Sequence, residues 1–153
     1  MLKLQKKLKN DYGLVFNDED LLKTAFTHSS FTNEERLPKI ANNERLEFLG
    51  DVALSLVISD YLYRTYPEKL EGELSKMRSS IVRTESLANF SRSCGFGEFL
   101  RLGHGEEKMG GRSRAALLAD IFESFTGAMY LEAGLETVKT FLSNTLFTEV
   151  DSF

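Results

Sequence analysis

The stretch from Asn42 to Asp51 constrains the fold of this chain more than any other part of the sequence. It reads NNERLEFLGD and continues directly into the apolar run 52–58. At about 100° per residue, the carboxylates of Glu44, Glu47 and Asp51 fall in one narrow sector of a helix. Because the helix becomes apolar nearly all round after Asp51, we predict that it is buried. The apolar residues expected to form its buried surface are Leu46, Phe48, Leu49, Ala53, Leu54, Leu56, Val57 and Ile58.

A second predicted helix, residues 112–131, repeats this combination of acids and apolar residues. Asp120 and Glu123 stand three residues apart and share one sector, while most of the remaining surface is apolar. Neighbouring carboxylates on buried helices repel one another, and burying one without a partner is costly. We expect a divalent cation bound by the carboxylate oxygens, rather than ion pairs with arginines, to compensate the charge of both clusters. The arginines available for such ion pairs are Arg45, Arg78, Arg112 and Arg114.

Five carboxylates on two packed helices indicate metal-dependent phosphoryl hydrolysis. Mg²⁺ and Mn²⁺ prefer oxygen ligands, and such ions activate water and stabilise the leaving oxygen of a phosphodiester. A di-iron bundle is excluded because neither His28 nor His104 has a glutamate three residues before it. Cys94 has no partner at metal-ligand spacing. All-helical nucleoside-triphosphate pyrophosphohydrolases also carry acidic pairs on their helices, and spacing alone leaves that alternative open.

The rest of the chain predicts one all-α domain, because 153 residues are enough for a single core and no alternating strand pattern is present. Asn17 and Asp20 resemble a capping box, and Asn42 or Asn43 is expected to cap the first acidic helix, which should end near Tyr63. We predict that His28 caps a helix or makes a core hydrogen bond. Further helices are expected at 2–9, 17–30, 72–82, 84–94 and 135–147, and loops at 31–41 and 96–111.

Charge and hydropathy bear on location and partners. No run approaches the roughly 20 apolar residues of a membrane span, and no signal-peptide core is present, so we predict no membrane contact and a cytoplasmic location. The formal net charge is −4, from 19 Lys+Arg and 23 Asp+Glu. That balance argues against tight, autonomous nucleic-acid binding. It does so only weakly, because an acidic metal site biases the count.

Several motifs resemble the catalytic domain of the ribonuclease III family. Residues 43–51, NERLEFLGD, reproduce that family's nine-residue motif in full, and the resemblance covers nearly the whole chain. Ser124 and Thr126 stand where Ala and Ile are commoner, and we expect no loss of activity from either. The other motifs, in the family's order, are HSS at 28–30, EGELS at 71–75 with Arg78, GGR at 110–112 and LADIFESFTGAMYL at 118–131.

The resemblance implies an all-helical homodimer, with about seven to nine helices in each chain, that cuts double-stranded RNA. The implied cofactor is Mg²⁺, with Mn²⁺ as a substitute, and the implied products carry 5′-phosphate and 3′-hydroxyl ends with short 3′ overhangs. Precursors of rRNA and mRNA are the implied substrates. The implied metal-binding acids are Glu47, Asp51, Asp120 and Glu123, of which Asp51 and Glu123 would be catalytic.

The resemblance also assigns residues beyond the metal acids. Glu44 would be an accessory acid near the RNA and the dimer cleft, and Phe48 would insert into a cavity of the partner subunit. The simpler alternative for Phe48 is an ordinary core position. The basic residues expected to line the RNA cleft are Lys76, Arg78, Lys108, Arg112 and Arg114.

Bacterial members of the family usually continue into a separate double-stranded-RNA-binding domain. We expect residues 1–153 to be the catalytic domain without that second domain, which reconciles the net charge of −4 with an RNA substrate. The non-enzymatic alternative is a relative of the same fold that only binds RNA or a ribosomal protein. Such a protein should have lost acids, and all five are present here.

Overall fold

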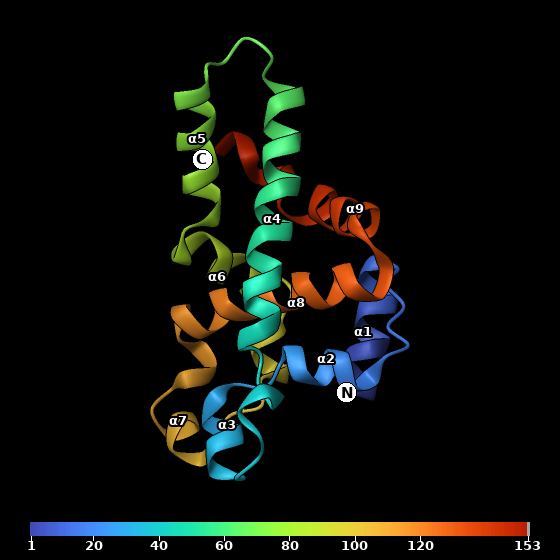
Figure 1. Ribbon diagram of the computed structural model, residues 1–153, viewed down its shortest axis with the longest axis vertical. Helices are drawn as coiled ribbons and strands as arrows, with labels where there is room; N and C mark the ends of the chain where they lie inside the picture. Colours follow the sequence, from blue (N-terminus) through green and yellow to red (C-terminus); the bar gives the residue numbers. More distant parts are fainter. Residues whose placement is uncertain (153) are drawn as a thin grey trace.

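Helices make up the regular structure of residues 1–152, the part of the chain that the computed structural model describes, with side chains described through residue 149 (Figure 1). Within these residues the strand-like pairing is one isolated bridge between Thr27 and Arg101. The prediction of an all-α fold with about seven to nine helices is confirmed. The α-helices are α1 (Leu2–Tyr12), α2 (Glu19–Ala25), α3 (Ser29–Glu34), α4 (Glu44–Thr65), α5 (Glu71–Val82), α6 (Thr84–Ser93), α7 (His104–Lys108), α8 (Ala115–Ala133) and α9 (Leu135–Thr145), and the 3₁₀ segments are η1 (Lys39–Ala41), η2 (Phe96–Phe99), η3 (Gly111–Ser113) and η4 (Phe147–Ser152).

Helix α8 is the centre of the core, because apolar side chains surround it on most sides. The ring of Phe125 lies 4.8 Å from that of Phe96, 5.5 Å from Phe141 and 6.1 Å from Phe26, measured between centroids. Tilted and edge-to-face aromatic contacts of this kind stabilise a core beyond the area that they bury. Helices α2, α4, α6 and α9 all contact α8. The acids of α8 therefore project from the most firmly packed helix of the molecule.

Helices α4 and α8 cross with their backbones in close contact at two glycines. A Cβ atom on Gly50 would overlap the backbone oxygen of Glu123, and one on Gly127 would overlap the backbone oxygen of Leu46. Neither position has room for a larger residue. This approach sets the turn of α4 that carries Glu47 directly against the turn of α8 that carries Glu123, and it thereby builds the site.

The second half of α4 rises beside α5 as an antiparallel hairpin above the body of the molecule (Figure 1). Helix α4 ends at Thr65, two residues before Pro67, as a proline requires. The end predicted near Tyr63 is correct within two residues. Although α4 has 22 residues, neither it nor any other helix within residues 1–152 is both long enough and apolar enough to cross a membrane.

The prediction that α4 is buried nearly all round is wrong. Phe48 is 79% exposed, Val52 59% and Leu56 53%. Because these three residues are spaced four apart, they share one face of the helix. We call this face the α4 stripe. The apolar residues that are buried as predicted are Leu46, Ala53, Leu54, Val57 and Ile58.

The beginning of α2 also differs from the prediction. Its N-cap is Asp18, whose carboxylate accepts a hydrogen bond from the backbone N–H of Leu21 at 3.0 Å. The expected cap, Asn17, instead donates its backbone N–H to the Glu132 carboxylate at 2.6 Å, as Asp18 does at 2.9 Å. The end of α8 therefore holds the segment before α2. Helix α2 also ends early, at Ala25, and does not continue to residue 30.

The two predicted loops contain short helices. Residues 31–41 include most of α3 and all of η1, and residues 96–111 include η2 and α7. Helices of five or six residues are too short to show an apolar period, so the sequence pattern does not reveal them. The prediction for His28 is confirmed, because its Nδ1 accepts a hydrogen bond from the backbone N–H of Ser30 at 3.1 Å and caps α3.

Candidate metal centre

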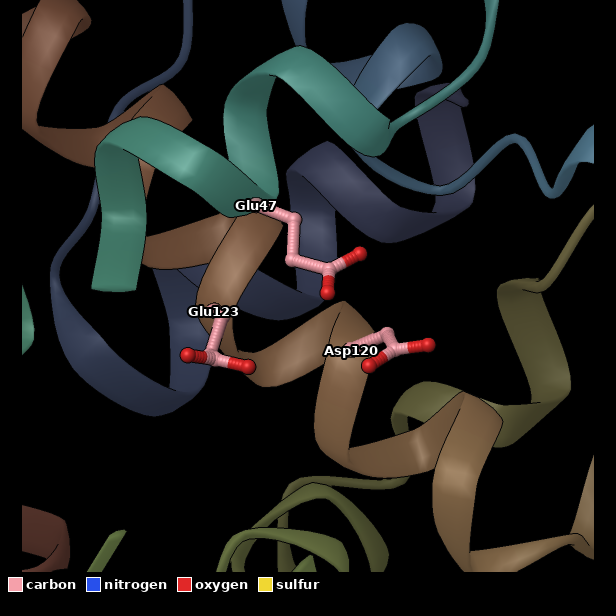
Figure 2. A group of neighbouring side chains, drawn as sticks. All are labelled: Glu47, Asp120 and Glu123. Atoms are coloured by element: carbon pink, nitrogen blue, oxygen red, sulfur yellow. The ribbon is translucent and has the colours of Figure 1, made fainter.

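Glu47, Asp120 and Glu123 form a compact carboxylate cluster where α4 crosses α8 (Figure 2). One carboxylate oxygen of each lies within 4.8 Å of those of the other two. Asp120 and Glu123 project from one side of α8 because they are three residues apart, and Figure 2 shows Glu47 reaching from α4 toward the space between them. We call these three residues the acid cluster.

The other two predicted acids, Glu44 and Asp51, flank the acid cluster on α4. Both are exposed. Asp51 shares a hydrogen bond with Glu123, and the charge of Glu44 acts on Glu47. The structure therefore brings all five acids together, with three in the cluster and one at each edge. Their roles in binding metal and in catalysis stay predictions.

Burial and mutual repulsion make the acid cluster hold protons. Burial, followed by the hydrogen bond and charge of Asp51, raises the pKa of Glu123 to about 8. Burial, followed by Asp120, raises the pKa of Glu47 to about 7. Burial also raises the pKa of Asp120, although its hydrogen bond with Glu47 and the nearby His28 act in the opposite direction. Near neutral pH, Glu123 is thus mostly protonated and Glu47 partly so, and a bound cation would favour the ionised form of each carboxyl.

Within the described residues, no lysine, arginine or histidine forms an ion pair with any of the five acids. Arg112 pairs with Glu107, and Arg114 with Glu106. Arg78 donates a hydrogen bond to the Ser59 hydroxyl at 2.9 Å. The alternative that arginines compensate the acids is therefore wrong. Several carboxylate oxygens, converging from two rigid helices without a protein cation, are a donor set that fits a divalent ion.

Buried hydroxyls on α8, next to Glu123, have their hydrogen bonds satisfied. Ser124 and Thr126 are fully buried. The Ser124 hydroxyl donates to the backbone oxygen of Ala25 at 2.7 Å, and the Thr126 hydroxyl to that of Phe122 at 2.7 Å. These two departures from the common family residues leave no orphaned polar group. The Ser124 bond also ties α8 to the end of α2.

Two of the five basic residues predicted to contact RNA are tied into the loop that precedes α8. The guanidinium of Arg112 donates to the backbone oxygens of Gly97 at 2.9 Å and Leu100 at 2.8 Å, and it bonds both carboxylate oxygens of Glu107 at 3.0 Å. Arg114 pairs with Glu106. These contacts favour a structural role for both arginines. Contact between either arginine and RNA stays a prediction.

The other three basic candidates lie on exposed surfaces. Lys76 and Arg78 are on α5, and Lys108 is at the end of α7. In the part of the chain that the structure describes, the ammonium groups of Lys76 and Lys108 have no ion-pair partner. They are therefore free to meet an external anion.

Phe48 lies beside a hollow of about 750 Å³. Its high exposure rules out the alternative that it is an ordinary core residue. The hollow also borders Glu44, so it adjoins the acidic end of α4. The apolar residues that line it with Phe48 are Leu21, Ile40, Leu46, Leu49 and Leu131.

Comparison with known proteins identifies the family. A family model described as Ribonuclease-III-like matches residues 18–150. The ribonuclease 3 of Lactococcus lactis subsp. lactis (strain IL1403) is 82% identical over 150 residues, which are 98% of this chain and 65% of the relative. The ribonuclease 3 of Streptococcus thermophilus is 58% identical over 151 residues, 99% of this chain and 66% of the relative. The chain therefore belongs to the ribonuclease-III-like family.

Solved structures agree with this assignment. The nuclease domain of ribonuclease III from Campylobacter jejuni superposes with a TM-score of 0.83 and 40% identity, covering 91% of this chain and 93% of that one. The Dicer of Pichia stipitis gives a TM-score of 0.66 and 31% identity over 92% of this chain and 59% of its own. The resemblance drawn from the sequence motifs is confirmed. The chain spans 65% of the length of the Lactococcus relative.

Proposed function

We propose that this chain is a divalent-metal-dependent endoribonuclease that hydrolyses double-stranded RNA. The observation that carries the proposal is the acid cluster: three carboxylates from two helices, within 4.8 Å of one another and without an ion-paired cation among the described residues, in a ribonuclease-III-like chain. Products with 5′-phosphate and 3′-hydroxyl ends and short 3′ overhangs are part of the proposal. So are rRNA and mRNA precursors as substrates and a cytoplasmic location.

We assign the metal to Glu47, Asp120 and Glu123, with Asp51 at the edge. Mg²⁺ is the proposed ion, with Mn²⁺ as a substitute, and when bound it supplies charge that activates water and stabilises the leaving oxygen. The residues of the chain contribute the position and protonation of the ligands. Asp51 holds the Glu123 carboxyl by a hydrogen bond. The crossing at Gly50 and Gly127 fixes the separation of the two helices.

We assign substrate contact to the exposed basic residues of α5 and α7. Phosphate contacts position a duplex without reading its sequence, and A-form RNA is recognised through its shape, phosphates and 2′-hydroxyls. Lys76, Arg78 and Lys108 are available for such contacts. Because the formal net charge is −4, we expect weak binding that depends strongly on salt. The proposed domain assignment is that residues 1–153 are the catalytic domain.

We further propose that the chain acts as a homodimer through the α4 stripe. Phe48 belongs to the stripe and also lines the hollow, so two copies related by a two-fold axis can each place Phe48 in the hollow of the other. The Campylobacter nuclease domain shows structural flexibility in a region involved in dimer formation. Phe48→Ala should shift the mass measured by light scattering from two chains to one, whereas Tyr63→Ala, at another exposed aromatic of α4, should leave it at two.

The function is tested by incubating the wild type and Glu123→Gln with long double-stranded RNA at low salt, in Mg²⁺ and then in EDTA. Glu68→Gln is the matched control, because Glu68 is an exposed acid outside the cluster. Short duplex fragments should form only with the wild type and Glu68→Gln, and only in Mg²⁺. If the wild type and Glu68→Gln do not cut, fusing a double-stranded-RNA-binding domain to each should restore cleavage. Failure of that rescue would favour an RNA-binding scaffold.

The pyrophosphohydrolase alternative loses support from the family assignment. It predicts release of pyrophosphate from free nucleoside triphosphates in Mg²⁺. We expect none from this chain.

A further inference from the structure

We infer that His28 is a substrate-binding residue, whose Nε2–H donates a hydrogen bond to a backbone oxygen of the RNA beside Asp120, and that Ser30 positions it. This inference rests on the proposed function and deepens it. It assigns to the HSS motif a role that capping alone does not require.

The hydrogen bonds around Ser30 fix the tautomer of His28. The backbone N–H of Gly103 donates to the Ser30 hydroxyl oxygen at 2.9 Å. The proton of that hydroxyl is then free to be donated to Nδ1 of His28, which lies 2.8 Å away. Nδ1 also accepts the backbone N–H of Ser30 at 3.1 Å. With two donors directed at Nδ1, the neutral ring carries its proton on Nε2.

The Nε2–H group is left without a partner within the described residues. The interactions of the His28 side chain with the protein are those at Nδ1. No buried side-chain nitrogen or oxygen in the described part of the chain lacks a hydrogen bond, so Nε2 reaches solvent. His28 is itself only half-buried. The ring therefore presents one fixed, accessible donor.

Backbone contacts hold this donor beside the acid cluster. The N–H of Asn43, at the start of α4, donates to the backbone oxygen of Thr27 at 2.8 Å, and the N–H of His28 donates to that of Arg101 at 3.0 Å. These bonds seat His28 between the beginning of α4 and the strand-like segment at Arg101. His28 is also close enough to Asp120 to act on it electrostatically.

The position suits an external oxygen acceptor. The acid cluster repels a phosphodiester until a cation neutralises it, and donors at its edge are then the groups that orient the phosphate oxygens or 2′-hydroxyls. A hydrogen bond to a charged group contributes about 1.5–3 kcal/mol, or roughly tenfold to a hundredfold in binding or rate. Its loss should therefore be measurable.

Two variants of His28 separate the donor from the cap. His28→Asn keeps a side-chain oxygen at the N-cap, where asparagine is favoured, but removes the outward donor. His28→Gln places an amide N–H near the position of Nε2 and weakens the cap. For each variant we would measure thermal unfolding, and the kcat and KM for double-stranded RNA in Mg²⁺. If His28 binds substrate, His28→Asn melts like the wild type and loses at least about tenfold in kcat/KM, and His28→Gln recovers part of that loss.

Nitrogen-15 NMR of the His28 ring tests the geometry without requiring activity. The spectrum should show an unprotonated Nδ1 and a protonated Nε2. On addition of duplex RNA to Glu123→Gln protein, which should bind without cutting, the Nε2–H signal should shift. In Ser30→Ala the backbone N–H remains as one donor to Nδ1 but the hydroxyl is lost, so the population of the protonated Nδ1 form should increase.

The outcomes distinguish the inference from the proposed function. If the wild type cleaves RNA and His28→Asn has the same kcat/KM, His28 is only a cap and the inference alone is overturned. A protonated Nδ1 in the neutral wild-type ring overturns it as well. If the wild type neither binds nor cuts double-stranded RNA, the proposed function fails and the inference falls with it.

Discussion

The crossing of α4 with α8 and the loop before α8 are both rich in charged residues, but they differ in whether those residues form ion pairs. In the loop, Arg112 and Arg114 pair with Glu107 and Glu106. At the crossing, within the described residues, five acids have no ion-paired cation, and burial holds the pKa of Glu123 well above its usual range. The loop uses paired charges to hold its own shape, whereas at the crossing ionisation of the acids costs stability and raises their pKa values.

This difference shows how a structural charge is distinguished from a functional one. A paired charge on the surface contributes little to stability and needs no further explanation. Several like charges, half-buried on the two most firmly packed helices, lower stability unless something binds them. The acid cluster is therefore the part of the molecule to which we assign an external cation.

The largest expected effect comes from removing a carboxylate at the crossing. Replacing a residue that supports a metal ligand typically lowers metal affinity or activity by tenfold to a hundredfold. Because Glu123 is itself a proposed ligand, Glu123→Gln should lower the cleavage rate by more than about a hundredfold. Because the change also removes repulsion, the melting temperature in EDTA should be unchanged or higher. Calorimetry and a cleavage time course measure the two effects. A cleaving but unstable Glu123→Gln protein would assign Glu123 to the structure.

The next effect concerns the backbone contact that creates the crossing. In Gly50→Ala the new methyl group meets the Glu123 backbone, and overpacking of this kind costs about 1–3 kcal/mol or more. The matched control is Gly72→Ala on α5, where a Cβ has open space and where alanine favours the helix. Urea unfolding should show a large loss for Gly50→Ala and none for Gly72→Ala. Equal stabilities would mean that α4 and α8 do not need their close contact.

A smaller effect is expected in the loop. Arg112→Ala removes the hydrogen bonds to three backbone oxygens and to Glu107, and it should lower the free energy of unfolding by about 1–3 kcal/mol. Lys76→Ala should leave stability unchanged but weaken RNA binding and reduce its salt dependence. Denaturant titration and filter binding separate the two responses. If Arg112→Ala instead has normal stability and weakened RNA binding, Arg112 contacts RNA and its assigned structural role is wrong.

The smallest effect is the dependence of stability on pH in the absence of metal. The folded pKa values of Glu123, about 8, and Glu47, about 7, exceed the ordinary value of 4.5. Between pH 4.5 and 8 the folded state therefore binds more protons than the unfolded state, so stability falls as pH rises. In EDTA the melting temperature should drop by a few degrees from pH 5 to 8, less so in Glu123→Gln, and Mg²⁺ should restore it. A flat or rising curve would contradict the pKa shifts.

The sequence predicted those features that depend on the residues of one helix. The helical period is enough to group Glu44, Glu47 and Asp51, and separately Asp120 and Glu123. It indicates which residues share a face, but not what covers that face, which is why the helical pattern alone assigns Phe48 and Leu56 to the buried surface although both are exposed. The family resemblance instead predicts that Phe48 meets a partner subunit. The close contact at Gly50 arises only when two helices meet.

The loop was harder to predict for a related reason. The backbone oxygens that accept hydrogen bonds from Arg112 lie between residues 97 and 100, and no local pattern links them to residue 112. Helices α3 and α7 are too short to show a period. For His28, the cap was predictable from the residue type, but its closeness to Asp120 depends on the packing of α8 against the start of α4.

The most direct test of the acid cluster is an anomalous difference map from a crystal of this chain soaked in Mn²⁺. We predict a peak at about 2.0–2.3 Å from carboxylate oxygens of Glu47, Asp120 and Glu123, lost in Glu123→Gln. A map with no peak at the crossing, or with the same peak in Glu123→Gln, would contradict the assignment of these acids to a metal site.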